Sequence, residues 1–143
     1  MTEVEFHVNV PDRLQYACRL LRKASRKGVR VAVTGSTATL NELDRHLWSF
    51  EVEEFLPHVR VASAGVESSG QRRSPVWLVD EASLGVALAV LVNLGDQLAS
   101  GFEGYKRLIE VVSDDDIGLD AGRQRWKQYL ARGYVPRKHE VVS

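Results

Sequence analysis

Apolar and polar residues alternate strictly at the start of the chain. Residues 4–10, VEFHVNV, place valine or phenylalanine at every second position, which predicts a β-strand. In residues 13–27 the apolar positions recur at intervals of three and four, which predicts an amphipathic helix that ends before Gly28. A β-branched run at residues 29–33 predicts a buried strand, and residues 34–48, TGSTATLNELDRHLW, predict a second helix. This succession is a βαβα unit, so we expect a parallel sheet covered by helices.

The second half of the chain continues with shorter apolar runs. Residues 75–80, 86–92 and 107–112 each predict a further strand. Residues 50–62 are typical of a connector with an extended segment, and residues 64–74, rich in Gly, Ser and Arg, predict an exposed loop. These runs extend the predicted sheet beyond its first two strands.

Length and composition fit one domain. The chain has 143 residues, of which 44% are hydrophobic and 27% charged, and these are ordinary globular values. We therefore predict a single Rossmann-like α/β domain over residues 1–143, with a mostly parallel sheet flanked by helices, a basic C-terminal helix at residues 116–132 and a short tail. Cys18 is the one cysteine, which excludes an internal disulfide and favours a reducing compartment. Neither a signal peptide nor a bilayer-spanning run is present, so we expect a cytoplasmic protein without membrane contact.

Charge is balanced overall but uneven along the chain. The formal net charge is zero, which argues against the whole molecule being a nucleic-acid binder. Between Asp120 and Lys138, however, bases strongly outnumber acids: Arg123, Arg125, Lys127, Arg132, Arg137 and Lys138. Such a basic end attracts an acidic partner, although a solvated helix face gives the same pattern.

The sequence offers no constellation for catalysis. Residues 34–37, TGST, resemble a phosphate loop but lack its lysine and spacing, and a helix cap explains them equally well. The four histidines lack the spacing of metal ligands, and the HExxH and GxSxG motifs are missing. We therefore predict no catalytic residue, metal or cofactor. A nucleotide-binding enzyme on a Rossmann-like scaffold remains the alternative from another class.

The closing helix carries a mixed face. Arg123, Trp126, Lys127 and Leu130 stand at i, i+3, i+4 and i+7, so they lie on one side of a helix. An indole beside two cations suits a ligand with an apolar group next to carboxylates. The alternative reading has Trp126 half buried against the sheet while its basic neighbours extend to solvent. A third reading is a direct single-stranded nucleic-acid binder that uses these side chains with Arg125.

A second apolar cluster lies in residues 47–58, LWSFEVEEFLPH. These residues include more large apolar groups than one helix end and its connector bury easily. Part of the segment is therefore a candidate protein interface, and packing against the domain's own core is the alternative. The sequence leaves open which of Trp48, Phe50 and Phe55 is exposed.

Over nearly its full length the chain resembles the family of the chi subunit of bacterial DNA polymerase III. The resemblance rests on FHVNV, on RKGVRVAV and above all on two longer segments, LDRHLWSFEVEEFLPH and RQRWKQYLARGY. Members of that family are non-catalytic adaptors that join the psi subunit, and through it the clamp loader, to single-stranded DNA-binding protein (SSB). They grip the acidic C-terminal tail of SSB, which ends in a hydrophobic residue with a free carboxylate.

The resemblance also implies site residues. Arg123, Trp126 and Lys127 would form the tail site, with Val112 and Tyr129 close to it.

The Trp48 and Phe55 surface, with Pro57 and His58, would meet psi or a helicase that competes with psi, and DNA would be contacted only indirectly. Leu119 departs from the family pattern, which has another base there. The site is therefore expected either to hold the tail less tightly or to use Arg132, Arg137 or Lys138.

Overall fold

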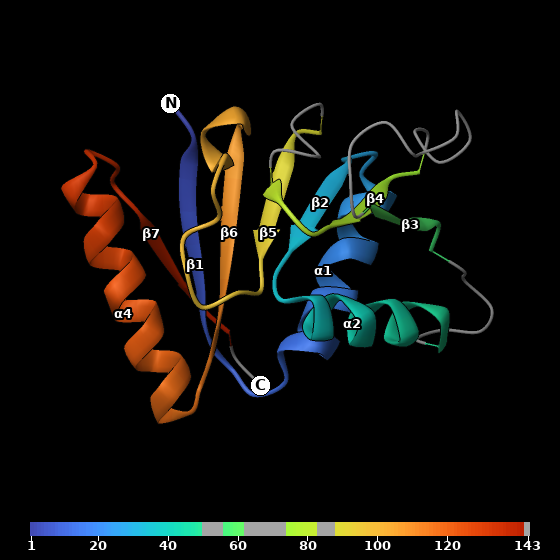
Figure 1. Cartoon of the computed structure of the whole chain (residues 1–143), viewed down its shortest axis with the longest axis horizontal. Helices are drawn as coiled ribbons and strands as arrows, with labels where there is room; N and C mark the ends of the chain where they lie inside the picture. Colours follow the sequence, from blue (N-terminus) through green and yellow to red (C-terminus); the bar gives the residue numbers. More distant parts are fainter. Residues whose placement is uncertain (50–55, 62–73, 83–87, 142–143) are drawn as a thin grey trace.

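The computed structural model describes residues 1–49, 56–61, 74–82 and 88–141 and places seven strands in one sheet (Figure 1). The strands are β1 (Glu3–Val10), β2 (Val31–Thr34), β3 (His58–Val61), β4 (Val76–Val79), β5 (Val90–Asn93), β6 (Arg107–Ser113) and β7 (Arg137–Glu140). Their order across the sheet is β3-β4-β2-β5-β6-β1-β7, and each neighbouring pair is parallel. The predicted α/β fold is confirmed.

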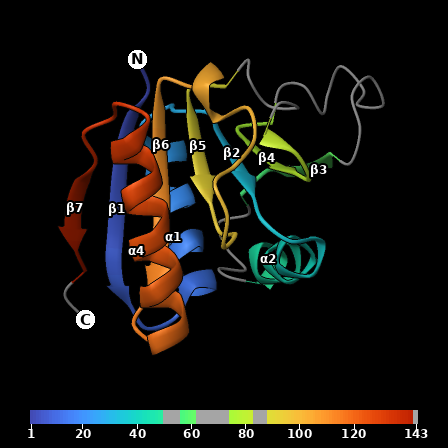
Figure 2. The same cartoon turned by 60° about the vertical axis from the view of Figure 1, so that its left-hand side comes forward.

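Helices cover both faces of this sheet. Figure 2 shows α4 (Asp116–Ala131) in front of β1 and β6, with α1 (Arg13–Arg26) behind them. The second helix, α2 (Thr37–Ser49), shares the α1 face, and a short 3₁₀ turn, η2 (Phe102–Gly104), contributes to the core of the α4 face. The all-buried strands β2, β4 and β5 touch both layers, which is why their sequences are continuous apolar runs without alternation.

Two strands occupy segments for which the sequence predicted none. The connector at residues 50–62 contains the edge strand β3, whose alternate residues Val59 and Val61 are buried. The predicted tail contains β7, RKHE, which pairs with β1 although all four of its residues are exposed. Because β7 is held at the sheet edge by backbone hydrogen bonds and needs no apolar side chains, periodicity does not detect it. In β3 the alternation spans only four residues, which is too short to distinguish a strand from a connector.

The remaining boundaries shift by a few residues. The strand predicted at 86–92 is β5, which begins at Val90, and residues 83–87 lie outside the described part of the chain. Most of the predicted loop at 64–74 also lies outside the described residues. Among the residues that are described, no helix has both the length and the apolar character needed to cross a bilayer.

Candidate functional site

A groove with a volume of about 820 Å³ runs between α4 and the β1–β7 edge of the sheet. We name it the α4 groove. Its lining residues come from β1, β6, α4 and β7: Phe6, Val8, Asn9, Val112, Leu119, Gly122, Arg123, Trp126, Lys127, Lys138 and Glu140. Four of the predicted site residues, Val112, Arg123, Trp126 and Lys127, therefore line the same groove.

Local sequence fixes the start and end of α4. The backbone N–H of Gly118 donates a hydrogen bond to the carboxylate of Asp115 at 2.7 Å, which caps the helix and lowers the pKa of that carboxyl group. The helix ends before Gly133, which has a φ of 90° that glycine adopts at little cost. Between these ends, the i, i+3, i+4 spacing turns Arg123, Trp126 and Lys127 toward the groove, whereas Leu130, predicted on the same face, does not line it.

Trp126 forms a wall of the groove and is partly buried. Its ring meets the ring of Phe6 edge to face, with 5.0 Å between centroids. Val112 and Leu119 add apolar surface, while Arg123 and Lys127 are exposed at the rim. The indole therefore packs on the sheet, as the second reading of this helix face expected, and it also borders the groove.

Glycine at position 122 lets α4 approach β6 closely. A Cβ atom at Gly122 would lie 2.9 Å from Cγ1 of Val112, closer than carbon atoms in contact normally come. The floor of the groove therefore depends on this glycine.

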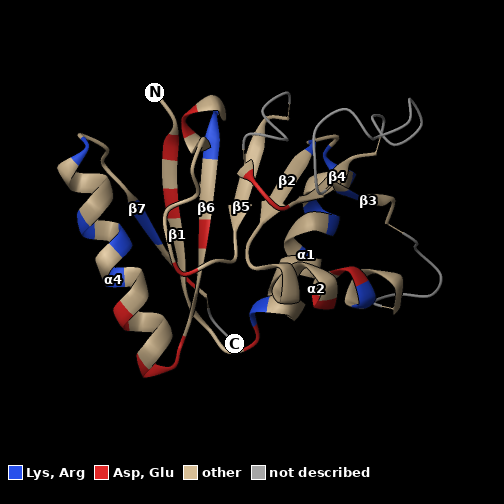
Figure 3. Ribbon diagram, viewed as in Figure 1, with Lys and Arg blue, Asp and Glu red and all other residues tan. Residues whose placement is uncertain are grey.

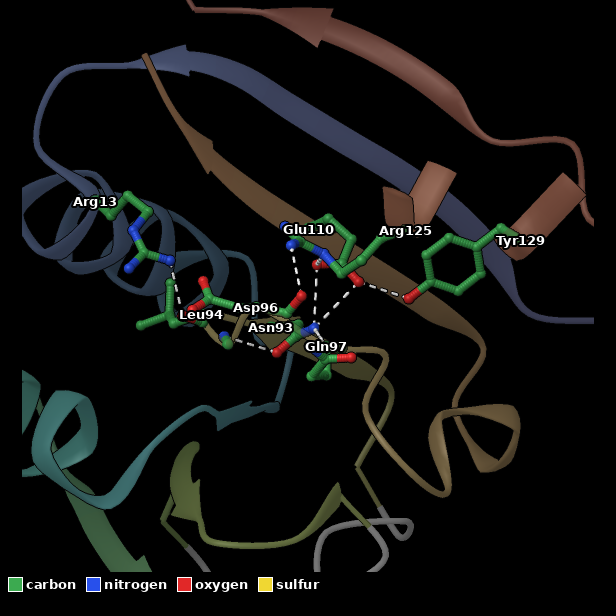
Figure 4. Close-up of polar contacts among 9 residues, drawn as sticks. Arg13, Asn93, Leu94, Asp96, Gln97, Glu110, Arg125 and Tyr129 are labelled. Carbon is green, nitrogen blue, oxygen red and sulfur yellow. Dashed lines mark hydrogen bonds and ion pairs between the residues drawn. The ribbon is translucent and has the colours of Figure 1, made fainter. Parts of the chain in front are cut away.

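Tyr129 and Arg125 face the sheet rather than the groove. Tyr129 has no exposed surface, and its hydroxyl donates a 2.5 Å hydrogen bond to Oε2 of Glu110 (Figure 4). Nε of Arg125 donates to Oε1 of Glu110 at 2.9 Å, and the Asn93 amide contacts both carboxylate oxygens at 3.1 Å. Tyr129 therefore lies behind the groove and is not among its lining residues. The reading that placed Arg125 on an exposed basic surface is wrong, because its side chain is buried.

The helical repeat explains this placement. Gly122, Arg125 and Tyr129 stand at i, i+3 and i+7 and make up the buried stripe of α4. Because arginine at position 125 is charged, the sequence assigned it to the solvent side. The available signal was Glu110, a lone acid inside the apolar run RLIEVV that requires a buried partner.

Burial sets the protonation behaviour of this cluster. Removal from water raises the pKa of the Glu110 carboxyl group, while the Arg125 charge and the donated hydrogen bonds oppose that rise. Burial and the neighbouring carboxylate also raise the pKa of Tyr129, so its hydroxyl remains a donor. Further bonds reach the segment after β5, from Arg125 Nη1 to the Asp96 carbonyl at 3.1 Å and from Asn93 to the Gln97 carbonyl at 2.9 Å. The cluster thus fastens α4, β6 and this segment together.

The cations that were expected to compensate for Leu119 differ in position. Lys138 lines the groove from β7, because its register partner is Phe6. Arg137 pairs in register with Glu5 and is not among the residues that line the groove. Arg132 lies 3.6 Å from Glu103 and is likewise not among the groove residues. Figure 3 shows the bases of α4 on its C-terminal half and those of β7 beside β1.

A separate surface surrounds the C-terminal end of α2. Trp48 is 62% exposed, and its ring meets that of His58 edge to face at 5.3 Å. His58 itself is held beneath the surface, where its ring nitrogens contact Asp44 and the Leu56 carbonyl at 2.8 Å each. Pro57 is exposed, whereas Phe55 and Phe50 lie outside the described residues. Among the described residues of this predicted interface, Trp48 and Pro57 are therefore the accessible ones.

The TGST segment caps a helix. The backbone N–H of Thr39 donates to the hydroxyl of Ser36 at 3.1 Å, as expected for the start of α2. The segment borders a cavity of about 670 Å³ at the carboxyl ends of β2 and β5, a place where α/β proteins often bind ligands. Its lining residues include neither a lysine nor a histidine. Across the described ranges, no three His, Cys, Asp or Glu side chains are placed to hold a metal ion.

Comparison with known proteins gives consistent matches. The sequence model of the family described as DNA polymerase III chi subunit, HolC, matches residues 1–137. The chain is similar to DNA polymerase III subunit chi of Pseudomonas aeruginosa, with 33% identity over 99% of this chain and 98% of that protein. It is also similar to DNA polymerase III subunit chi of Haemophilus influenzae, with 26% identity over 84% of this chain and 81% of that protein.

Proposed function

Because this chain belongs to the DNA polymerase III chi subunit family, we propose that it is a non-catalytic adaptor of the replication machinery. In this proposal, the α4 groove binds the acidic C-terminal tail of SSB, and the surface around Trp48 binds psi, which connects the chain to the clamp loader. Through these two surfaces the protein reaches DNA only by way of SSB.

One observation carries the tail-binding part of the proposal. Two exposed cations, Arg123 and Lys127, flank the partly buried indole of Trp126 above a groove of about 820 Å³. An acidic tail with a terminal hydrophobic residue matches both halves of this surface. The carboxylates pair with the cations, and the last side chain packs against the ring and the Val112–Leu119 floor.

Charge and entropy together limit the expected affinity. Ion pairs at a partly exposed rim are screened by salt, and a disordered tail loses conformational freedom when it binds. We therefore expect a dissociation constant on the order of micromolar that weakens as salt rises.

A peptide titration tests the tail site. The probe is an acidic peptide with a C-terminal phenylalanine, prepared with a free carboxylate and, separately, as the amide. Calorimetry or the tryptophan fluorescence of the chain follows binding. We expect Arg123→Ala and Lys127→Ala each to weaken binding about fivefold to tenfold, and the amidated peptide to bind worse than the acid. Arg45→Ala, which removes an exposed base from α2 on the other face of the sheet, is the matched control. Equal binding by the wild type and both α4 variants would remove the groove from the proposal.

The partner surface needs a separate experiment. Trp48→Ala removes an exposed aromatic group at the end of α2 and leaves the α4 groove intact. We expect it to weaken association with psi, or with a helicase that competes with psi, and to leave the peptide titration unchanged. Loss of tail binding in this variant, or unchanged association with psi, would contradict the assignment of two separate surfaces.

A further inference from the structure

A second cavity, of about 380 Å³, lies on the opposite face of the sheet from the α4 groove. It is enclosed by α1 and by the amino-terminal parts of β1, β5 and β6, and we name it the α1 cavity. Its floor consists of aliphatic side chains from β2, β5 and β6. Volumes of about 300–1,000 Å³ with a mainly apolar lining are usual for small-molecule sites.

The rim of the α1 cavity carries four cations. Arg19, Lys23 and Lys27 stand at i, i+4 and i+8 on one side of α1 and are exposed, and Arg107 faces them from β6. Within the described residues, no carboxylate lies at ion-pair distance from Arg19, Lys23 or Lys27. Glu5 is the one acid in the lining, and its carboxylate already accepts from Arg107 at 2.8 Å. The rim therefore has a net positive charge.

Helix stability does not account for this arrangement. Bases in the last turn of α1 offset the helix dipole, but Arg19 lies a turn earlier and Arg107 belongs to a strand. The sequence from residue 13 to residue 30 contains seven Lys and Arg and no Asp or Glu, which is a higher density of bases than the C-terminal helix has. Such a concentration of positive charge points to an anionic ligand.

Aromatic rings border the same cavity. The His7 ring lies between Tyr16 on α1 and His139 on β7, with centroid separations of 5.6 Å and 4.9 Å. Both ring nitrogens of His7 also have hydrogen-bond partners, one being the Tyr16 hydroxyl and the other the Glu5 carboxylate. His7 is buried, whereas Tyr16 is partly exposed and His139 is exposed, so the outer two rings are accessible.

We propose that the α1 cavity binds a nucleoside phosphate, either free or as a unit of a single-stranded nucleic acid. The phosphate lies among Arg19, Lys23, Lys27 and Arg107, and the base packs against Tyr16 or His139. Cations next to accessible rings are the combination with which proteins hold unpaired nucleotides, since every base offers a face for stacking. An acidic peptide would use the cations but not the rings. Because the cavity and the α4 groove lie on opposite faces of the sheet, this inference does not depend on the proposed tail binding.

The test uses the full chain at low salt, about 20 mM, where phosphate contacts are strongest. A fluorescein-labelled oligothymidylate of about ten nucleotides is followed by anisotropy, and dTMP and AMP are added as unlabelled competitors. We expect the double variant Lys23→Ala/Lys27→Ala to weaken binding about tenfold and His139→Ala to weaken it about threefold. Arg26→Ala, a base on α1 that does not line the cavity, is the control and is expected to change binding less than about twofold.

Each outcome has a defined meaning. Competition by dTMP or AMP identifies a free nucleotide as a sufficient ligand, and binding of the oligothymidylate alone identifies a strand. The inference is overturned if neither probe binds, or if Arg123→Ala/Lys127→Ala abolishes binding while Lys23→Ala/Lys27→Ala does not. It is also overturned if backbone amide resonances of α1 shift with the acidic tail peptide but not with the nucleotides. Circular dichroism of every variant separates lost binding from lost folding.

Discussion

Nε of Arg125 lies 2.9 Å from Oε1 of Glu110, in an ion pair whose arginine is 3% exposed and whose glutamate is fully buried. The pair joins α4 to β6 directly behind the α4 groove. Tyr129 and Asn93 occupy the remaining acceptor positions of the carboxylate, so the buried charge is fully hydrogen-bonded.

Removal of Arg125 should destabilise the fold strongly. Arg125→Met leaves Glu110 buried without its charge partner, and we expect the free energy of unfolding to fall by about 3 kcal/mol. Urea denaturation measures the change, with Arg123→Met on the exposed side of the same helix as the control, expected within about 0.5 kcal/mol of wild type. In the double variant Arg125→Met/Glu110→Gln we expect partial recovery. A loss no larger than that of Arg123→Met would mean that the pair does not fasten the helix.

A methyl group at position 122 should separate α4 from β6. Alanine normally stabilises a helix by about 1 kcal/mol relative to glycine, but here its Cβ would lie 2.9 Å from Val112. Overpacking of this kind costs about 1–3 kcal/mol, so we expect Gly122→Ala to lower the free energy of unfolding and to weaken tail-peptide binding.

The same substitution in a Val112→Ala background isolates the cause. There the contact is relieved, and Gly122→Ala is expected to be neutral or stabilising. The same loss in both backgrounds would refute the steric explanation.

Neighbouring residues of β7 should behave differently. Lys138 points into the α4 groove and Arg137 does not, so Lys138→Ala is expected to weaken tail-peptide binding about threefold while Arg137→Ala has no effect. Calorimetry with the peptide at low salt checks both. An equal loss in the two variants would indicate general electrostatic attraction and not a local contact.

The free energy of unfolding should fall as the pH drops below about 6.5, where histidine in the unfolded chain takes up a proton. Burial lowers the pKa of His7, helped by nearby His139 and Arg107, although the hydrogen bond and charge of Glu5 oppose this. Because the unfolded chain binds this proton more readily, the contribution of His7 is complete above a pH of about 6.5 and is lost as pH falls through its lowered pKa in the folded state.

A comparison with His7→Gln tests whether His7 causes the loss of stability at low pH. We expect the thermal midpoint of the wild-type protein to decrease between pH values of about 7.5 and 5.5, and that of the variant to decrease less. The Tyr16 hydroxyl contacts the same ring, so Tyr16→Phe serves to show that loss of this hydrogen bond alone does not flatten the profile. Parallel profiles for the wild type and His7→Gln would exclude His7 as the source.

The sequence was sufficient to predict those strands whose burial leaves a pattern of apolar side chains. Alternation identified β1, and buried apolar runs identified β2, β4 and β6, because both faces of these strands are covered. The strand β7 was not predictable, since backbone pairing at an edge leaves no pattern in the side chains.

Within the candidate site, the sequence predicted several residues that line the groove but not the buried residues behind it. Helical spacing correctly brought Arg123, Trp126 and Lys127 to one groove. It did not separate them from Arg125 and Tyr129, because a buried arginine depends on a carboxylate that lies far along the chain, in β6. The α1 cavity was missed for a related reason: its rings come from three elements, and only the tertiary structure brings them together.

The position of β1 has a consequence for biosynthesis. This first strand lies between β6 and β7, the last two strands of the chain (Figure 1). On the ribosome its hydrogen-bonding partners do not yet exist while the first hundred residues are being made. Pairing of β1 must therefore await the synthesis of β6 and β7, and such long-range closure is expected to make folding slow and to leave the nascent β1 segment dependent on protection from aggregation.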